Sequence, residues 1–222
     1  MAMGIEMPDS EFFLINGPSN YNMTLYDIKP KFQDLLRPIV RVFFIRGVTA
    51  NQVTVSAAIF SMVLGAVLML FPEPRLYILL PVFLFIRMAL NAIDGMLARE
   101  FNQQSKLGVI LNEASDIIAD AALYLAFAFV TGVCPWLVVL VVLLSWLTEF
   151  CGVIAQTLTA KRNYRGPMGK SDRAFVLGTL GLFIALWPQY IIVVNIVFGI
   201  LAVLLAWTSI NRCCSALEVN NA

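Results

Sequence analysis

Histidine is absent from this chain of 222 residues. Its absence excludes a Ser-His-Asp triad, a histidine general base and histidine metal ligands. Charged residues are also scarce, at 13%, whereas a soluble domain carries roughly a quarter, so a soluble globular protein is excluded. The four cysteines show no CxxC spacing, and we interpret them as embedded or cytosolic thiols outside any disulfide framework: Cys134, Cys151, Cys213 and Cys214.

Hydrophobic residues make up 60% of the chain and stand in long runs. Because one membrane span takes about 20 residues, the length has room for about five to seven spans and for no separate soluble catalytic domain. The runs predict an all-α integral membrane protein, a six-transmembrane-helix bundle. We place the spans at about residues 52–71, 76–98, 107–130, 135–160, 174–188 and 190–210.

A further helix is predicted before the first span. Apolar residues recur every three to four positions over residues 25–46, with basic residues between them, which predicts an N-terminal amphipathic helix in the membrane interface. Residues 1–22 have no basic n-region and no apolar h-region, so they do not form a signal peptide. The chain thus divides into a flexible extension (1–22), the interfacial helix (23–50), the membrane domain (51–212) and a C-terminal tail (213–222).

Lysine and arginine indicate the orientation of the spans. With the N-terminus in the cytoplasm, 13 of the 15 basic residues fall on the cytoplasmic side. Only Arg75 falls outside, and Arg87 lies within a span. The positive-inside rule therefore favours both termini in the cytoplasm, and we expect a multi-pass protein of a bacterial inner membrane.

Six ionisable residues stand within the predicted spans, where charge is costly and usually functional: Arg87, Asp94, Glu113, Asp116, Asp120 and Glu149. At ~100° per residue, one face of the third span carries four polar side chains: Asn112, Glu113, Asp116 and Asp120. Asn91 and Asp94 share a face of the second span. Antiparallel neighbours would bring these faces together, and oxygen ligands without histidine or cysteine suit Mg²⁺, Mn²⁺ or Ca²⁺.

Three of these residues suggest a separate role. Arg87, Asp120 and Glu149 lie at a similar depth, roughly 15–20 Å from the cytoplasmic ends of their spans. We interpret them as a structural ion network within the bundle. A small transporter that uses these three charges is an alternative, but it leaves the spacing of the motif below unexplained.

Residues 91–116 carry a spaced motif, NAIDGMLAREFNQQSKLGVILNEASD. It resembles the signature of the CDP-alcohol phosphotransferase family, D-x2-D-G-x2-A-R-x8-G-x3-D-x3-D. The matching residues, at fixed spacing across the end of one span and the start of the next, are Asp94, Gly95, Ala98, Arg99, Gly108 and Asp116. The resemblance covers about residues 25–212, because six spans, cytoplasmic termini and an interfacial helix are also typical of the family.

The resemblance implies a transferase that moves a phosphatidyl group from CDP-diacylglycerol to a small alcohol or lipid acceptor and releases CMP. Asp94 would be a metal ligand and Arg99 a phosphate donor, and Asp116 would ligate metal and act as general base. Gly95, Ala98 and Gly108 would be small to admit the nucleotide. Asn51 and Thr54 resemble the family's N-x-x-T and would be secondary donors to it.

Two positions depart from the family pattern, because its first and third aspartates are Asn91 and Asn112 here. An amide oxygen still ligates hard cations, but the four motif positions carry a formal charge of −2 in place of −4. The sequence therefore leaves three alternatives: one Mg²⁺ or Mn²⁺ ion binds, or Glu113 and Asp120 compensate so that two bind, or the protein is a non-catalytic relative that binds CDP-lipid.

The predicted loop at residues 161–173 is basic, and its charged candidates are Arg162, Arg165, Lys170 and Arg173. One interpretation is an anion pocket for a phosphate-bearing or acidic acceptor; the other is an anchor that touches anionic membrane lipids. Both interpretations stay open. No nucleic-acid partner is expected, and the resemblance implies a homodimer as one oligomeric state.

Overall fold

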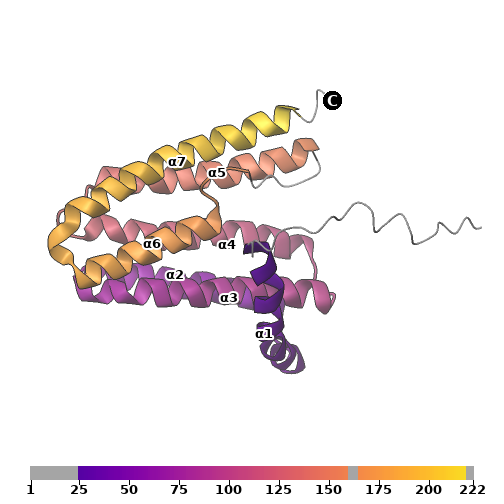
Figure 1. Cartoon of the computed structure of the whole chain (residues 1–222). Helices are drawn as coiled ribbons and strands as arrows, with labels where there is room; N and C mark the ends of the chain where they lie inside the picture. Colours follow the sequence, from indigo (N-terminus) through magenta and orange to yellow (C-terminus); the bar gives the residue numbers. More distant parts are fainter. Residues whose placement is uncertain (1–24, 160–164, 219–222) are drawn as a thin grey trace, which may run out of the picture.

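The computed structural model describes residues 25–159 and 165–218, and in this part of the chain every regular element is helical. Long helices run side by side as a bundle, while α1 crosses one end of it (Figure 1). The elements are α1 (Leu25–Ile45), α2 (Ala50–Leu70), η1 (Pro74–Ile78), α3 (Leu79–Glu100), α4 (Lys106–Leu125), η2 (Ala126–Phe129), α5 (Pro135–Thr159), α6 (Lys170–Leu186), η3 (Pro188–Tyr190) and α7 (Ile191–Glu218).

Helix α1 packs across the end of α3. Leu36 and Val40 are buried in a small cluster with residues of α2 and α3, and the Arg37 guanidinium lies 3.3 Å from Glu100. Other apolar side chains of α1 remain exposed, among them Leu35 and Ile45. This division is the one expected of an interfacial helix, whose position in the membrane stays a prediction.

Small residues allow α2 and α4 to pack closely. A Cβ atom added to Gly65 would lie 2.4 Å from the carbonyl oxygen of Ala122, so only glycine fits there. The start of α2 is fixed by a capping box, in which Thr49 and Gln52 bond each other's backbone N–H groups. This packing holds the C-terminal half of α4 against α2, and the amide of Asn51 lies over Gly108 near the other end of α4, so α2 aligns α4 along its length and positions the motif.

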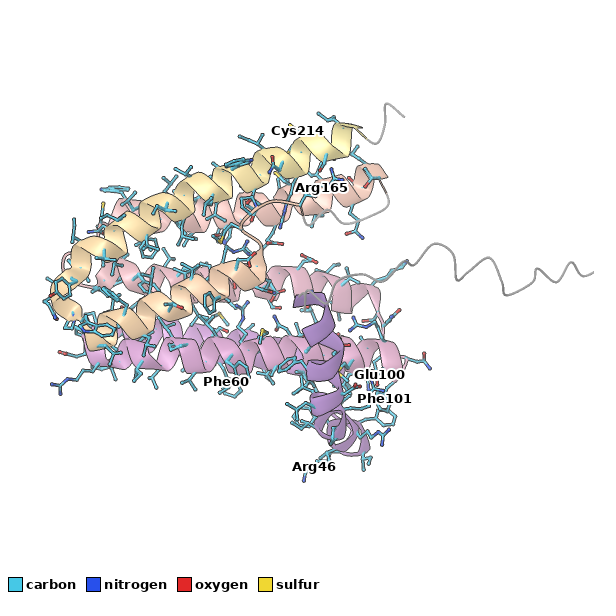
Figure 2. The ribbon with its side chains drawn as sticks, in the orientation of Figure 1. Arg46, Phe60, Glu100, Phe101, Arg165 and Cys214 are labelled. Atoms are coloured by element: carbon cyan, nitrogen blue, oxygen red, sulfur yellow. The ribbon has the colours of Figure 1, made fainter. Side chains whose placement is uncertain are left out.

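The other helices form two more pairs: α6 packs on α3 and η1, and α5 packs on α7. At Gly181 and Gly178 of α6 the backbone approaches η1 and α3 closely. Side chains on the outside are apolar, as at Phe60 of α2, which points away from the bundle (Figure 2). An apolar exterior around a helical bundle is the surface that lipid tails require.

Four helices are long and apolar enough to cross a membrane: Ala50–Leu70, Pro74–Glu100, Pro135–Thr159 and Pro188–Leu217. Within the described residues, the third and fifth predicted spans do not meet this measure. Helix α4 carries Glu113, Asp116 and Asp120, and α6 has only 17 residues. The chain is therefore a multi-pass membrane protein with four clear spans, and the count of six stays a prediction.

Several predicted boundaries differ from the structure. Helix α6 begins at Lys170 rather than at residue 174, because Asp172 accepts the N–H of Gly169 at 2.9 Å and starts the helix there. Helix α7 continues to Glu218, beyond the tail boundary predicted at residue 213. The predicted extension 1–22 and Arg162 of the basic loop lie outside the described residues.

Candidate functional site at the motif helices

The motif lies where α3 ends and α4 begins. Ser105 caps α4 by accepting the N–H of Gly108 at 2.9 Å, and the Gln103 side chain accepts the N–H of Ala50 at 2.7 Å. The connection between the two motif helices is thereby tied to the start of α2. Three helices thus bring the motif residues and the N-x-x-T residues to one region.

Asp94 is the deeply buried carboxylate of the motif, with only 5% of its surface exposed. It accepts a hydrogen bond of 2.6 Å from the Thr54 hydroxyl of α2. That hydroxyl also donates to the carbonyl oxygen of Ala50 at 3.1 Å. The contact fixes the rotamer of Asp94 and joins two residues that the sequence had assigned to the same site.

Asp116 lies opposite on α4 and accepts bonds from three side chains. The Asn91 amide donates to Oδ1 at 3.2 Å, and the Arg87 guanidinium donates to the same oxygen at 3.2 Å. The Lys170 ammonium forms an ion pair with Oδ2. The predicted meeting of the Asn91 and Asp116 faces is therefore present, together with two cations that the sequence had not placed there.

The small motif residues lie beneath polar side chains. A Cβ atom on Gly95 would stand 3.1 Å from the guanidinium of Arg99, which folds back over it. A Cβ atom on Gly108 would stand 2.8 Å from the amide oxygen of Asn51. Both glycines therefore leave room for a polar group directly over helix backbone. Ala98 is half-buried on the last turns of α3, and Asn112 is half-buried one turn before Asp116.

A buried ion network stands behind the motif. Arg87 pairs with Asp120, Asp120 lies 3.3 Å from Arg173, and Arg173 lies 2.9 Å from Glu149. Arg212 of α7 donates to the carbonyl oxygen of Thr148 and lies 3.8 Å from Glu149. The predicted network of Arg87, Asp120 and Glu149 is present, but Arg173 links its two halves.

These contacts change two sequence interpretations. Both oxygens of Asp120 are engaged by guanidinium groups, so Asp120 is not placed to compensate for the missing carboxylates. Arg173 is only 1% exposed and does not lie at the mouth of the bundle as predicted. Of the described loop cations, only Arg165 is exposed, on the side of α5 and α7 (Figure 2).

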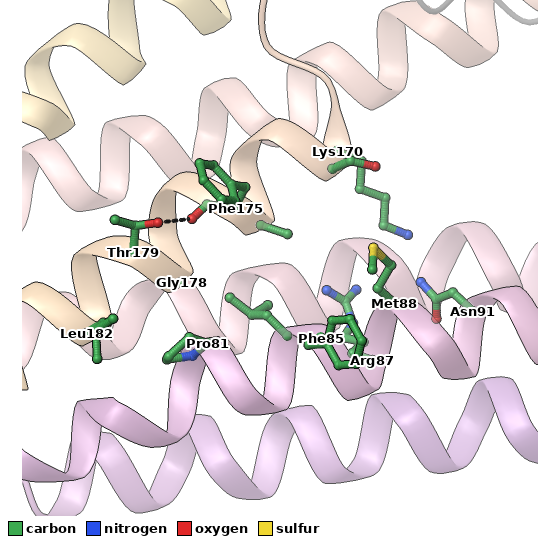
Figure 3. A pocket seen from close by; sticks show the side chains of 13 residues that line it. Pro81, Phe85, Arg87, Met88, Asn91, Lys170, Phe175, Gly178, Thr179 and Leu182 are labelled. Atoms are coloured by element: carbon green, nitrogen blue, oxygen red, sulfur yellow. Dashed lines mark hydrogen bonds between the residues drawn. The ribbon is translucent and has the colours of Figure 1, made fainter. Parts of the chain in front are cut away.

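A cavity of about 450 Å³ opens between α3 and α6 beside Asp116. Figure 3 shows Lys170 reaching from the start of α6 toward Asn91 and Arg87 at one end, whereas Pro81, Gly178 and Leu182 lie at the other. One end is therefore polar and cationic, and the rest is apolar. Such a cavity fits a molecule with an anionic head and a hydrocarbon tail.

The model of the CDP-alcohol phosphatidyltransferase family matches residues 47–208. The chain belongs to this family. It is 53% identical over 195 residues to the inner membrane protein YnbA of Escherichia coli (strain K12), covering 88% of this chain and 97% of that protein. The resemblance drawn from the motif is confirmed, and membership of this family supports an enzyme of this class.

Solved structures share the fold. Phosphatidylinositol phosphate synthase (PgsA1) of Mycobacterium tuberculosis, in complex with manganese and citrate, has a TM-score of 0.68 at 18% identity, covering 81% of this chain and 88% of that one. The same protein with CDP-DAG bound has a TM-score of 0.68 at 18% identity, covering 81% and 92%. This chain therefore has the same helical fold as that protein, which has been solved once with manganese and citrate and once with CDP-DAG.

The four motif positions carry the kind of donor atom that a hard cation takes. The motif offers carboxylates at Asp94 and Asp116 and amide oxygens at Asn91 and Asn112, all oxygen donors of the kind that Mg²⁺ and Mn²⁺ take. No group of three or more His, Cys, Asp or Glu able to hold a metal occurs within residues 25–159 and 165–218. Of the two motif carboxylates, Asp116 is contacted by Arg87 and Lys170. Asp94 accepts a hydrogen bond from the neutral hydroxyl of Thr54.

Sequence reasoning missed the position of Lys170. It had been counted with the basic loop, but it starts α6 and contacts Asp116. The pattern Gly169-Lys-Ser-Asp172 is a helix-start signal, and it would have moved the start of the span to Lys170. Lys170 and Arg173, three residues apart, would then have fallen on one helix face.

Proposed function

We propose that this chain transfers a phosphatidyl group from CDP-diacylglycerol to an alcohol acceptor and releases CMP. The observation that carries the proposal is the contact of Asn91 and Lys170 with Asp116, at the cationic end of a cavity whose other end is apolar. Asp94, three residues after Asn91 on the other motif helix, is buried against Thr54. A cytidine-diphosphate lipid needs both a cationic clamp for its pyrophosphate and an apolar groove for its acyl chains.

Each residue has a role in this proposal. Asp94, aligned by Thr54, ligates the divalent cation in this proposal, and the amide oxygens of Asn91 and Asn112 complete the ligand set. When bound, the cation neutralises charge on the pyrophosphate and polarises its P–O bonds. Arg99 donates to the phosphates, and Asn51 donates to the nucleotide above Gly108. The side chains at Gly95, Ala98 and Gly108 are small, which lets the nucleotide approach the helix backbone.

Asp116 takes the proton of the acceptor hydroxyl in the proposed reaction. The acceptor oxygen then forms a bond to the phosphorus that carries the diacylglycerol, and the bond from that phosphorus to the bridging oxygen breaks. CMP leaves with the bridging oxygen and its electron pair. Because the Lys170 side chain is 33% exposed and the Arg87 side chain only 5%, an acceptor reaches Asp116 from the side of Lys170.

The test is a turnover assay on purified protein. CDP-diacylglycerol, Mg²⁺ or Mn²⁺ and a panel of acceptors are supplied, CMP is quantified, and the lipid product is identified by mass. We expect CMP release that requires the cation and falls at least about 100-fold in Asp116→Asn and Asp94→Asn. Asp34→Asn, which changes an exposed carboxylate of α1, serves as the matched control. Wild-type protein that releases no CMP with any acceptor would contradict the proposal.

A non-catalytic role in binding CDP-lipid is the second candidate, favoured by Asn91 and Asn112 at two aspartate positions of the motif. It predicts saturable binding of CDP-diacylglycerol by wild-type protein with no CMP released. The turnover assay and a binding titration on the same preparation distinguish the two candidates.

We also infer that α4 and α6 cross the membrane, giving six spans with both termini in the cytoplasm. Helix α4 packs along α2, and α6 packs along α3. Within the bundle, Asp116 and Asp120 of α4 pair with Lys170 and Arg173 of α6, so these four charges are turned toward each other rather than toward lipid. Single cysteines in a cysteine-free background, placed at Lys106 and Thr131 around α4 and at Ser171 and Gln189 around α6, test this by labelling from either side of sealed vesicles. The two positions of each pair should be reached from opposite sides.

A further inference from the structure

The electrostatic surroundings of Asp94 and Asp116 differ sharply. Asp94 accepts a neutral hydroxyl from Thr54. Asp116 has the Arg87 guanidinium on one oxygen and the Lys170 ammonium on the other. A cation next to Asp116 would therefore meet two positive groups at short range, whereas a cation at Asp94 would meet none in direct contact.

Lys170 reaches Asp116 from a fixed starting point. The segment before it is held by two hydrogen bonds, from the N–H of Met168 to the Thr208 hydroxyl at 3.1 Å and from the N–H of Gly169 to Asp172 at 2.9 Å. Gly166, with φ of +126°, packs directly on Thr208. The ammonium is thus presented to Asp116 by local structure, and Figure 3 shows the extended side chain crossing from α6 to α3.

The charges of the ion network and of the two motif aspartates balance without any metal, and Arg99 and Glu113 on the motif helices add one charge of each sign. The cluster contains four cations (Lys170, Arg87, Arg173 and Arg212) and four carboxylates (Asp94, Asp116, Asp120 and Glu149). One divalent cation would add two positive charges, which equals the two negative charges of a pyrophosphate diester. Two divalent cations would leave a surplus of two positive charges in a low-dielectric site, where uncompensated charge is costly.

We propose that the Lys170 ammonium stands in for a second divalent cation at Asp116, so that this chain binds one divalent cation, at Asp94. The inference rests on the proposed function for the identity of the site as a metal site, but it concerns the number of ions bound. The amides Asn91 and Asn112 fit it, because each removes a negative charge that a second divalent cation would otherwise neutralise.

Counting bound Mn²⁺ by electron paramagnetic resonance on purified full-length protein in detergent, without substrate, tests the proposal. We expect one Mn²⁺ per chain in the wild type and none in Asp94→Asn. Two ions in the wild type, or none, would overturn the proposal, and this measurement requires no variant to fold. The number of bound Mn²⁺ ions does not depend on turnover. CMP release tests the proposed function and the Mn²⁺ count tests the single-ion proposal, and each measurement can fail without the other.

A triple variant gives the converse test. Asn91→Asp, Asn112→Asp and Lys170→Met together restore two carboxylates and remove the ammonium, and this variant should bind two Mn²⁺ per chain. The matched control replaces Lys170→Met by Lys106→Met, at an exposed lysine of α4, and should still bind one. Equal counts in the two triple variants, with both eluting as folded protein, would overturn the role given to Lys170.

Discussion

Replacing Arg173 by methionine removes the charge that joins two buried carboxylates while keeping most of the side-chain volume. The Arg173 guanidinium is 2.9 Å from Glu149 and 3.3 Å from Asp120, and it donates to the Thr148 hydroxyl at 3.1 Å. Breaking a buried ion pair by removing one partner costs about 3–5 kcal/mol, because the remaining charge stays buried. Since another arginine lies near each carboxylate, we expect the lower value, about 3 kcal/mol.

That free energy corresponds to roughly a 150-fold change in the folding equilibrium. It can be measured by titrating folded protein in mild detergent micelles with SDS and comparing the unfolding midpoints. Arg75→Met, at an exposed arginine of η1, should unfold like the wild type. The double variant Arg173→Met with Glu149→Gln should recover part of the loss, because it removes an uncompensated carboxylate. An Arg173→Met midpoint equal to that of Arg75→Met would refute the buried network.

Three further changes test the site and its packing. Thr54→Val, which removes the hydroxyl from Asp94, should weaken Mn²⁺ binding about 10-fold in a titration, whereas Thr54→Ser should bind like the wild type; equal affinities of the two variants would contradict the alignment role. Gly65→Leu should lower the unfolding free energy by about 1–3 kcal/mol, because its Cβ would lie 2.4 Å from the carbonyl oxygen of Ala122; an unchanged SDS midpoint would contradict the close packing. Asn91→Asp should lower the melting temperature in EDTA and gain more from Mn²⁺ than the wild type does; identical melting curves in both conditions would contradict the contact with the last motif aspartate.

The sequence was sufficient to predict the helices and the family. Apolar runs located α2, α3 and α5 to within three residues of their observed ends, because a helix that crosses a membrane requires a long run of apolar residues. Motif spacing predicted that Asn91 would meet Asp116 across two antiparallel helices, and the structure places their side chains 3.2 Å apart. The helix positions depend on the local pattern of apolar residues, and the contact between Asn91 and Asp116 depends on two helices that are neighbours in the sequence.

Pairings between distant helices could not be predicted in the same way. The 53 residues that separate Asp120 from Arg173 contain α5 and the loop, and no sequence pattern states which face of α6 turns toward α4. Periodicity gives the polar face of each helix but not the rotation of one helix against another. Arg173 was therefore assigned to a solvent-facing loop, although the hydrogen bond that starts α6 at Lys170 carries it into the bundle.

Asn91 of α3 and Lys170 of α6 both contact the carboxylate of Asp116. The presence of one contact explains why the other residue is tolerated. An aspartate at position 91 would stand at the distance where Asn91 now donates to Asp116, 3.2 Å, and two carboxylates so close need a cation between them. With asparagine, an amide N–H supplies that contact on one oxygen, and the Lys170 ammonium supplies the charge on the other. The loss of the motif carboxylate at position 91 is therefore matched by side chains of the chain itself, and the missing aspartate there does not by itself argue against catalysis.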